Sequence, residues 1–395
     1  MRLLKEKPSP RCSETSFTAP ITGAARLPRF LKTKECKEGV RILVLNYEYP
    51  PIGGGAANAT KHLVHEWAKQ GLIVDVITSS QGGYQEESPV DGVRIFRLDV
   101  AKKEVHHWRL SEIFRWMGGA RYEMRRLHEE HPYDIVVALP SSPCGFLAYQ
   151  LNVPFVLCLR GSDVPGFNPR LKLIDTFGAW VYRRLWAAAD AMVANSAGLA
   201  ALAHKTSDVD IDVIPNGVSR LPQHTPTQTR RPRLLFVGRL VGRKGLQDAL
   251  SALQGLDASL TVVGDGVMRE ELEALAQDLD VTFLGAQPHT RVNELYAQHD
   301  VFIQTSYHEG MSNTMLEALS AGLPMIMSSC EGSEEIFCGN GVLVSAGDVD
   351  AIREAIIVLQ DPQMRAECAQ KSALHAQQFT WESVAEQYHS LFLRL

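Results

Sequence analysis

Three basic side chains occur together in the segment 238–245, which reads GRLVGRKG and directly follows a short apolar run. They are Arg239, Arg243 and Lys244, and they are conspicuous because residues 234–395 hold 9 Lys and Arg against 22 Asp and Glu. A solvated surface gives no reason for cations to gather against the charge of their own domain. The cluster therefore predicts that an anionic group binds here, and a phosphate fits best.

Two glutamates flank the expected start of a helix in the segment 308–318, HEGMSNTMLEA. Ser312 and Asn313 are good N-cap residues, and the first turn of a helix has free N–H groups that bind phosphate or sugar oxygens. Glu309 precedes this turn, whereas Glu317 lies over one turn inside the helix, in an apolar stretch. A buried carboxylate needs hydrogen-bond donors, which vicinal sugar hydroxyls supply. The alternative is that Glu317 is an ordinary surface residue.

A glycine-rich loop, with Gly53, Gly54 and Gly55, follows the first apolar run of the chain. Such a loop lets the backbone approach a ligand and directs N–H groups at anions, although a tight strand-to-helix turn explains it as well. The dinucleotide-binding fingerprint would need glycine where this chain has Asn58, and the second apolar run ends in Thr-Ser-Ser rather than in an acidic residue. These departures argue against a nicotinamide-dependent dehydrogenase.

Arg160 and Asp163 follow another apolar run, in the segment LRGSDVPG, and we expect them to form either a structural ion pair or a ligand contact. His62 and His65 have no acidic or cysteine partner nearby in the sequence, which favours a solvated helix face over a metal site. The seven cysteines lack metal-binding spacing and are typical of reduced thiols in a cytosolic protein. We therefore expect no metal site and no cofactor.

Short apolar runs alternate with helix-like stretches in both halves of the chain, as in the strand–helix–strand crossovers of parallel sheets. The runs lie at 41–45, 74–78, 93–96, 135–138, 155–158, 191–194 and 212–215 in the first half, and at 234–237, 259–263, 281–284, 301–304, 325–327 and 341–344 in the second. This pattern predicts an α/β fold with two Rossmann-like, doubly wound domains that face a cleft.

The expected domain boundaries follow changes in composition. Residues 1–38 mix Pro, Ser, Thr and Lys without periodicity, which predicts a flexible leader. The two domains are expected at 39–217 and 234–378, joined by a Pro-, Thr- and Arg-rich linker at 218–233. A final helix at about 379–395 must dock on one of them, and the first domain is one option.

Composition and charge exclude several classes of protein. With 395 residues, 45% hydrophobic and 22% charged, the chain has the composition of a water-soluble globular protein and not that of a disordered, collagen-like or disulfide-scaffold protein. The N-terminus lacks the continuous apolar stretch of a signal peptide. The uncharged segment 135–159 is long enough to span a bilayer, but Pro140, Pro143 and Pro154 interrupt it. A cytoplasmic protein without a nucleic-acid partner is expected.

The segment 106–126 combines Trp, Phe and Leu with several arginines. Two interpretations stay open, an ordinary amphipathic helix that precedes the next strand and a helix that lies on an anionic membrane. The second would place the protein peripherally at the inner face of the membrane.

In its motifs and their order the chain resembles the retaining glycosyltransferases of family four (glycosyl transferases group 1), which have the GT-B fold. The resemblance covers residues 40–395, and its most specific piece is the stretch 309–324. The matching elements are the glycine loop at 53–55, IPNGV at 214–218, the basic segment at 238–245, GDG at 264–266, and the E-x(7)-E pair formed by Glu309 and Glu317.

The resemblance implies transfer of a hexosyl group from a nucleotide diphosphate sugar to an acceptor hydroxyl, with retained configuration and without a metal ion, in polysaccharide or glycoconjugate synthesis. The resemblance also implies that the terminal helix packs on the first domain. The implied catalytic residues are Glu309, Asp163, Arg239 and Lys244. The implied donor-binding residues are Gly54, Gly55, Gly310, Met311, Ser312, Asn313 and Glu317. Many relatives have histidine where this chain has Arg160, which is expected to contact the donor sugar or the acceptor and to favour an anionic group.

The implied partners are a UDP- or GDP-sugar, which is a co-substrate rather than a cofactor, and a carbohydrate or lipid-linked acceptor. Two other functions fit the same motifs, namely a non-catalytic protein that binds nucleotide sugars and a GT-B nucleotide-sugar epimerase.

Overall fold

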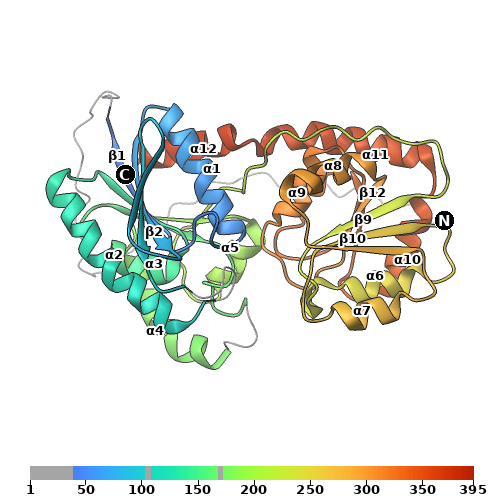
Figure 1. Ribbon diagram of the computed structural model, residues 1–395, viewed down its shortest axis with the longest axis horizontal. Helices are drawn as coiled ribbons and strands as arrows, with labels where there is room; N and C mark the ends of the chain where they lie inside the picture. Colours follow the sequence, from blue (N-terminus) through green and yellow to red (C-terminus); the bar gives the residue numbers. More distant parts are fainter. Residues whose placement is uncertain (1–38, 103–107, 168–171) are drawn as a thin grey trace, which may run out of the picture. The chain divides into compact units, whose positions relative to one another are not determined.

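The computed structural model describes residues 39–102, 108–167 and 172–395, so the expected leader and part of the segment 106–126 lie outside the described residues. Two sheets organise the chain, one in each half (Figure 1). The first has the strand order β3-β4-β2-β1-β5-β6-β7-β8. Its strands are β1 (Arg41–Leu45), β2 (Ile73–Ser80), β3 (Gln85–Val90), β4 (Val93–Asp99), β5 (Ile135–Ala138), β6 (Phe155–Leu159), β7 (Ala191–Ala194) and β8 (Asp212–Val213).

Every strand pairing in this sheet is parallel except that of β3 with β4. β3 was not predicted, because its sequence QEESPV carries charges and lacks an apolar pattern, and all six of its side chains are exposed. The strand order reverses beside β1, which lies between β2 and β5. In doubly wound sheets ligands bind at such a switch point, outside the carboxyl ends of the strands.

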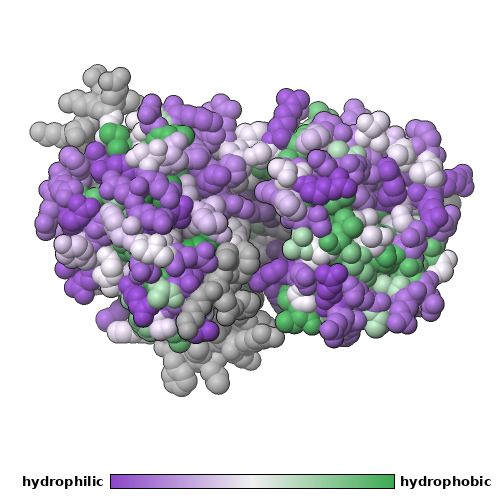
Figure 2. Space-filling model, in the orientation of Figure 1, coloured by the Kyte–Doolittle hydropathy of each residue, from purple (hydrophilic) through white to green (hydrophobic). Residues whose placement is uncertain are grey.

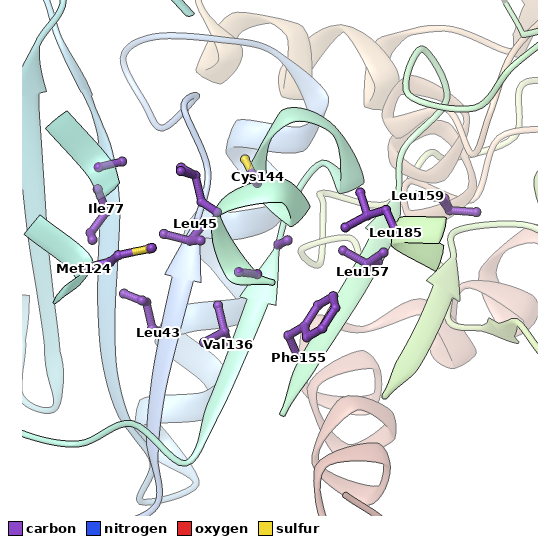
Figure 3. Close-up of a cluster of buried hydrophobic side chains, with 14 of the residues drawn as sticks. Leu43, Leu45, Ile77, Met124, Val136, Cys144, Phe155, Leu157, Leu159 and Leu185 are labelled. Carbon is purple, nitrogen blue, oxygen red and sulfur yellow. The ribbon is translucent and has the colours of Figure 1, made fainter. Parts of the chain in front are cut away.

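Helices cover both faces of the first sheet. The helices are α1 (Gly55–Lys69), α2 (Leu110–Glu130), α3 (Ser141–Ala148), α4 (Lys172–Ala188) and α5 (Ala197–His204). Successive residues of β1 alternate between two apolar clusters, as the two-residue period of a strand requires. Leu43 and Leu45 lie in the cluster of Figure 3, together with Met124 of α2 and Leu185 of α4. The helices α2, α3 and α4 therefore cover the same face.

The second sheet is parallel throughout, with the order β11-β10-β9-β12-β13-β14. Its strands are β9 (Arg233–Val237), β10 (Ser259–Val263), β11 (Val281–Gly285), β12 (Val301–Gln304), β13 (Met325–Ser328) and β14 (Gly341–Val344). Its helices are α6 (Leu246–Leu253), α7 (Arg269–Leu275), α8 (His289–Gln298), α9 (Asn313–Ser320), α10 (Val349–Val358) and α11 (Pro362–His375), with short 3₁₀ turns at Gly242–Lys244 and Ala376–Phe379. The predicted α/β fold with two doubly wound units is confirmed.

The terminal helix α12 (Trp381–Phe392) packs on α1, although the whole second sheet lies between them in sequence. The buried ring of Trp67 meets Tyr388 and Phe392 edge to face, with centroids 5.5 and 5.2 Å apart. His62 stacks flat on Trp381 at 4.8 Å. The expected solvated face at His62 is therefore wrong, because the returning helix covers it.

The surface drawn in Figure 2 is mainly hydrophilic, with small apolar patches. None of the helices within the described ranges is both long and apolar enough to cross a bilayer.

We predict that the contact between α1 and α12 contributes much of the stability of the first half. Leu391 is 2% exposed in the cluster around Trp67, so Leu391→Ala should cost about 2–5 kcal/mol and lower the thermal unfolding midpoint by about 5 °C or more. The matched control is Leu393→Ala, because Leu393 is 66% exposed and its truncation should change little. Equal effects of the two variants would contradict the prediction.

Candidate active site

The N-terminus of α9 is the centre of the candidate site. Ser312 is the N-cap residue, and the first intrahelical hydrogen bond runs from the Leu316 N–H to the Ser312 carbonyl oxygen (3.1 Å). The N–H groups before Leu316 therefore have no helical acceptor. The Ser312 hydroxyl is less available than expected, since it lies 3.3 Å from the Gln304 amide and 3.0 Å from the Thr314 hydroxyl.

The basic cluster and the first glutamate come together in space. Lys244 Nζ lies 2.7 Å from the Glu309 carboxylate, and Arg243 lies 3.9 Å from the same oxygen. Lys244 is 8% exposed, so most of its side chain is out of water. Arg239 is exposed, and its guanidinium makes no ion pair or hydrogen bond with any residue that the structure describes. It is thus a cation that is free to meet a ligand.

Gly245 explains how Lys244 reaches this position. Its φ is +67°, and a Cβ there would lie 1.9 Å from the carbonyl oxygen of Thr305. Only glycine fits such a close approach in this conformation. The glycine after the basic cluster therefore lets the backbone pass against the end of β12, one strand away in the sheet.

Glu317 is held by protein groups. Its carboxylate accepts a hydrogen bond from the Tyr296 hydroxyl (2.8 Å), and His289 lies 3.5 Å away. Burial raises the pKa of the Glu317 carboxyl, and burial followed by this carboxylate raises the pKa of Tyr296. The expected need for donors is thus met in part by Tyr296, while the side chain stays 16% exposed.

A cavity of about 240 Å³ opens beside Glu317. Its wall mixes amide, imidazole and carboxylate groups with one indole, a composition suited to a polar ligand with hydroxyl groups. It draws residues from α1, α8, α9, α12 and the segment after β8, namely Asn58, His62, Gly217, Val218, Ser219, Leu221, His289, Asn293, Asn313, Glu317 and Trp381.

The glycine loop meets the start of α9. Gly54 is the N-cap residue of α1, which begins at Gly55. A Cβ on Gly55 would lie 3.3 Å from the Asn313 side-chain nitrogen, whereas a Cβ on Gly54 would have no neighbour within 4 Å. Gly310 lies near Asn195 of the first half, since a Cβ on it would be 3.6 Å from the amide oxygen. The backbone at Gly54 is therefore uncovered, close to the N-terminus of α9.

Arg160 and Asp163 make no ion pair with each other, although the sequence left that pairing open. The buried Asp163 carboxylate accepts backbone N–H bonds from Ser141 (2.8 Å), Arg160 (2.9 Å) and Gly161 (2.9 Å). Burial raises the pKa of this carboxyl. The Arg160 guanidinium instead binds the Asn216 side-chain oxygen (2.6 Å) and the Tyr388 hydroxyl (3.1 Å).

Met311 is almost fully buried, at 4% exposure, and both its side chain and its backbone contact Asn216: its sulfur accepts from the Asn216 backbone N–H at 3.1 Å and its carbonyl oxygen accepts from the Asn216 side-chain amide at 3.2 Å. Asn216, Tyr296 and Asn195 were not predicted as site residues. Asn216 lies in the IPNGV segment, which signals a strand end and not a contact. Within the described ranges no group of three or more His, Cys, Asp and Glu side chains is arranged to hold a metal ion.

Two family models match consecutive parts of the chain. Residues 54–217 match the glycosyl transferase 4-like domain, and residues 219–375 match glycosyl transferases group 1. The glycogen synthase of Mycobacterium tuberculosis is 27% identical over 402 residues, which cover 90% of this chain and 94% of the relative. A GDP-mannose-dependent alpha-mannosyltransferase of the same organism is 26% identical, with 85% and 92% covered.

Solved structures share the fold. The sucrose-phosphate synthase of Thermosynechococcus elongatus has a TM-score of 0.74 at 21% identity, with 90% of this chain and 98% of that chain covered. HepE from Anabaena, in complex with UDP and glucose, has a TM-score of 0.69 at 19% identity, with 90% and 100% covered. The chain, with its two matched halves and its GT-B fold, therefore belongs to the family-four glycosyltransferases, the glycosyl transferases group 1, and is a glycosyltransferase.

Proposed function

We propose that the protein transfers a hexosyl group from a nucleotide diphosphate sugar to an acceptor hydroxyl, with retention of the anomeric configuration and without a divalent metal ion. The observation that carries the proposal is the contact of Lys244 with Glu309 in front of the free N–H groups of α9. It places a cation, a helix N-terminus and a carboxylate around one space, which is what a sugar diphosphate requires.

In the proposed complex the diphosphate binds Arg239 and Lys244, the backbone N–H groups of residues 310–313, and the backbone of Gly54 and Gly55. The ribose hydroxyls bind Glu317 within the 240 Å³ cavity. Glu309 orients the donor sugar. Because Lys244 now pairs with Glu309, the arriving diphosphate exchanges one anionic partner of Lys244 for another and frees the carboxylate for the sugar.

In the proposed reaction the bond between the anomeric carbon and the phosphate oxygen breaks, and a bond from the acceptor oxygen forms on the same face of the sugar. The acceptor proton passes to an oxygen of the departing diphosphate. Negative charge grows on that diphosphate, so Arg239, Lys244 and the N-terminus of α9 stabilise the transition state more than the bound donor. Asp163 holds the loops of the site in place, since its carboxylate accepts hydrogen bonds from backbone N–H groups that follow the carboxyl ends of β5 and β6.

We further propose that the acceptor is a carbohydrate, lipid-linked or in solution, and that α2 rests on an anionic membrane at the cytoplasmic face. Three apolar side chains on the outer side of α2 are strongly exposed, Leu110 (74%), Phe114 (67%) and Tyr122 (71%). Two arginines share that side, Arg121 and Arg125, both exposed. An ordinary amphipathic helix shows solvent a polar face, whereas apolar residues mixed with arginine are typical of an interfacial helix.

The helix α4 extends this surface, because it covers the same sheet face as α2. Its Trp180 is 60% exposed and carries the Arg184 guanidinium 3.9 Å from its ring. Tryptophan and arginine together are suited to the level of lipid headgroups. A hollow of about 400 Å³ on α2, lined by Arg121, Arg125 and Tyr122 among others, offers space for a phosphate headgroup.

We predict that Lys244→Ala and Glu309→Ala each reduce donor turnover about 10²–10³-fold, because Lys244 stabilises the negative charge that develops on the diphosphate and Glu309 orients the donor sugar. Turnover is measured as nucleoside diphosphate released from UDP-glucose, UDP-galactose, GDP-mannose and ADP-glucose with a panel of glycan acceptors. Product NMR should show the donor's anomeric configuration, and a metal chelator should leave the rate unchanged. The control is Arg291→Ala, a surface cation paired with Glu294. Parental turnover in both site variants would refute the assignment.

We predict that the ionised carboxylate of Glu317 lowers the free energy of unfolding at neutral pH. Burial raises its pKa, so the folded state favours the protonated carboxyl, and that stability is lost as pH rises through the raised pKa. Glu317→Gln should therefore raise the unfolding midpoint by a few degrees at pH 8, and by less at pH 5, while donor binding weakens. Glu354→Gln, at an exposed position, is the control. A loss of stability that is equal at both pH values would contradict the prediction.

We predict that the protein sediments with vesicles that contain phosphatidylglycerol but not with vesicles of phosphatidylcholine alone. Phe114→Ser combined with Arg125→Glu should reduce vesicle binding at least tenfold, because each removes one component of the interfacial contact. The control is Val267→Ser combined with Arg353→Glu in the second half, with Val267 93% exposed. Binding that is independent of lipid charge, or equal loss in both double variants, would exclude the α2 surface.

A further inference from the structure

The Arg160 guanidinium is a junction between three parts of the fold. Arg160 directly follows β6 in the first half. One nitrogen donates to the Asn216 side-chain oxygen at 2.6 Å, and another donates to the Tyr388 hydroxyl at 3.1 Å. Asn216 belongs to the segment that leads from β8 to β9, and Tyr388 belongs to α12. These two segments are where the chain passes from one sheet to the other and returns.

Asn216 carries the contact onward to the candidate site. It is 6% exposed, and its side-chain nitrogen donates to the Met311 carbonyl oxygen and to the Asn313 side-chain oxygen, both at 3.2 Å. Met311 and Asn313 flank the N-cap of α9. A continuous series of hydrogen bonds therefore runs from Tyr388 through Arg160 and Asn216 to the start of the helix that we assign to the diphosphate.

The partners of this guanidinium are neutral. No carboxylate among the described residues forms an ion pair with it. Its planar fork presents nitrogens in a fixed geometry, so that one side chain can bind two acceptors on different segments. A lysine at this position would keep the charge and lose the fork. What this arginine supplies is thus orientation.

We infer that Arg160 is a positioning residue for donor binding: it fixes Asn216, and through Asn216 the N-terminus of α9, without touching the donor itself. The inference rests on the proposed function of α9. It also departs from the expected ligand contact at Arg160, because each terminal nitrogen already donates one hydrogen bond to a protein acceptor and Nε is buried.

The first test is Arg160→Lys. The N-terminus of α9 holds the diphosphate in the bound donor and, more strongly, in the transition state, so KM for UDP-glucose or GDP-mannose should rise about tenfold or more and kcat should fall as well. Leu391→Ala is the control for lost stability, because Leu391 lies in α12 outside the hydrogen-bond series. It should leave KM unchanged. A parental KM in Arg160→Lys would mean that charge alone suffices, and would overturn the inference.

A double-mutant cycle with Asn216→Ala tests the route. If Arg160 acts through Asn216, adding Arg160→Lys to Asn216→Ala should raise KM no further, because residues that act as one unit are not additive. Fully additive effects would mean that Arg160 meets the donor by itself. Tyr388→Phe keeps the Asn216 contact and should raise KM less than Arg160→Lys does. An equal or larger rise would mean that the arginine positions α12 instead of α9.

Calorimetric measurement of UDP and GDP binding distinguishes failure of the positioning role from failure of the proposed function. If the parent binds either nucleotide and Arg160→Lys binds it about tenfold less tightly, the positioning role holds whatever the acceptor. If the parent turns over a donor but the variant matches it in binding and KM, only the positioning role fails. If the parent neither binds these nucleotides nor turns over any donor, the proposed function fails and the inference fails with it.

Discussion

The unpaired N–H groups at the start of α9 are the constraint on which the rest of the site depends. A helix N-terminus attracts an anion only where the backbone in front of it stays uncovered and the helix itself is held still. Glycines allow the loops around this helix N-terminus to approach one another closely. A Cβ on Gly332 would lie 2.4 Å from the Gly310 carbonyl oxygen, and one on Gly55 would lie 3.3 Å from the Asn313 amide nitrogen. Any larger residue at Gly332 would displace the loop that leads into α9.

Electrostatics then select what occupies that space. The second half of the chain is strongly acidic, so a polyanion meets repulsion over most of that surface and attraction at one place. At that place Lys244 and Glu309 already form a pair, with exposed fractions of 10% and 15% for their side chains. A partly desolvated pair gains little net stability. Exchanging the carboxylate for a diphosphate therefore costs less than stripping two solvated charges would, and Glu309 becomes available only once an anion has arrived.

Much of this arrangement could be predicted from the sequence, because its signals are local. Short continuous apolar runs predicted the parallel strands, the segment GRLVGRKG predicted the basic cluster, and the N-cap residues Ser312 and Asn313 predicted the start of the helix that carries Glu317. The strand β3 was missed because a fully exposed edge strand has no apolar pattern. The partners of Arg160 were missed for another reason: Asn216 and Tyr388 lie 56 and 228 positions away. No local pattern encodes such contacts, and Tyr296 beside Glu317 is hidden likewise among the apolar positions of α8.

The two kinds of contact around α9 respond to different conditions. The pair formed by Lys244 and Glu309 consists of two full charges, so an anion that binds beside it competes for Lys244. The contacts of Arg160 join a buried amide and a buried hydroxyl, which are neutral and hardly screened. The ion pair of Lys244 therefore changes partner when the ligand binds, whereas the hydrogen bonds of Arg160 keep their partners. This difference gives a physical reason for an arginine with two neutral acceptors at the end of β6. Arg160 reaches both segments that link the halves, while Lys244 exchanges its anionic partner.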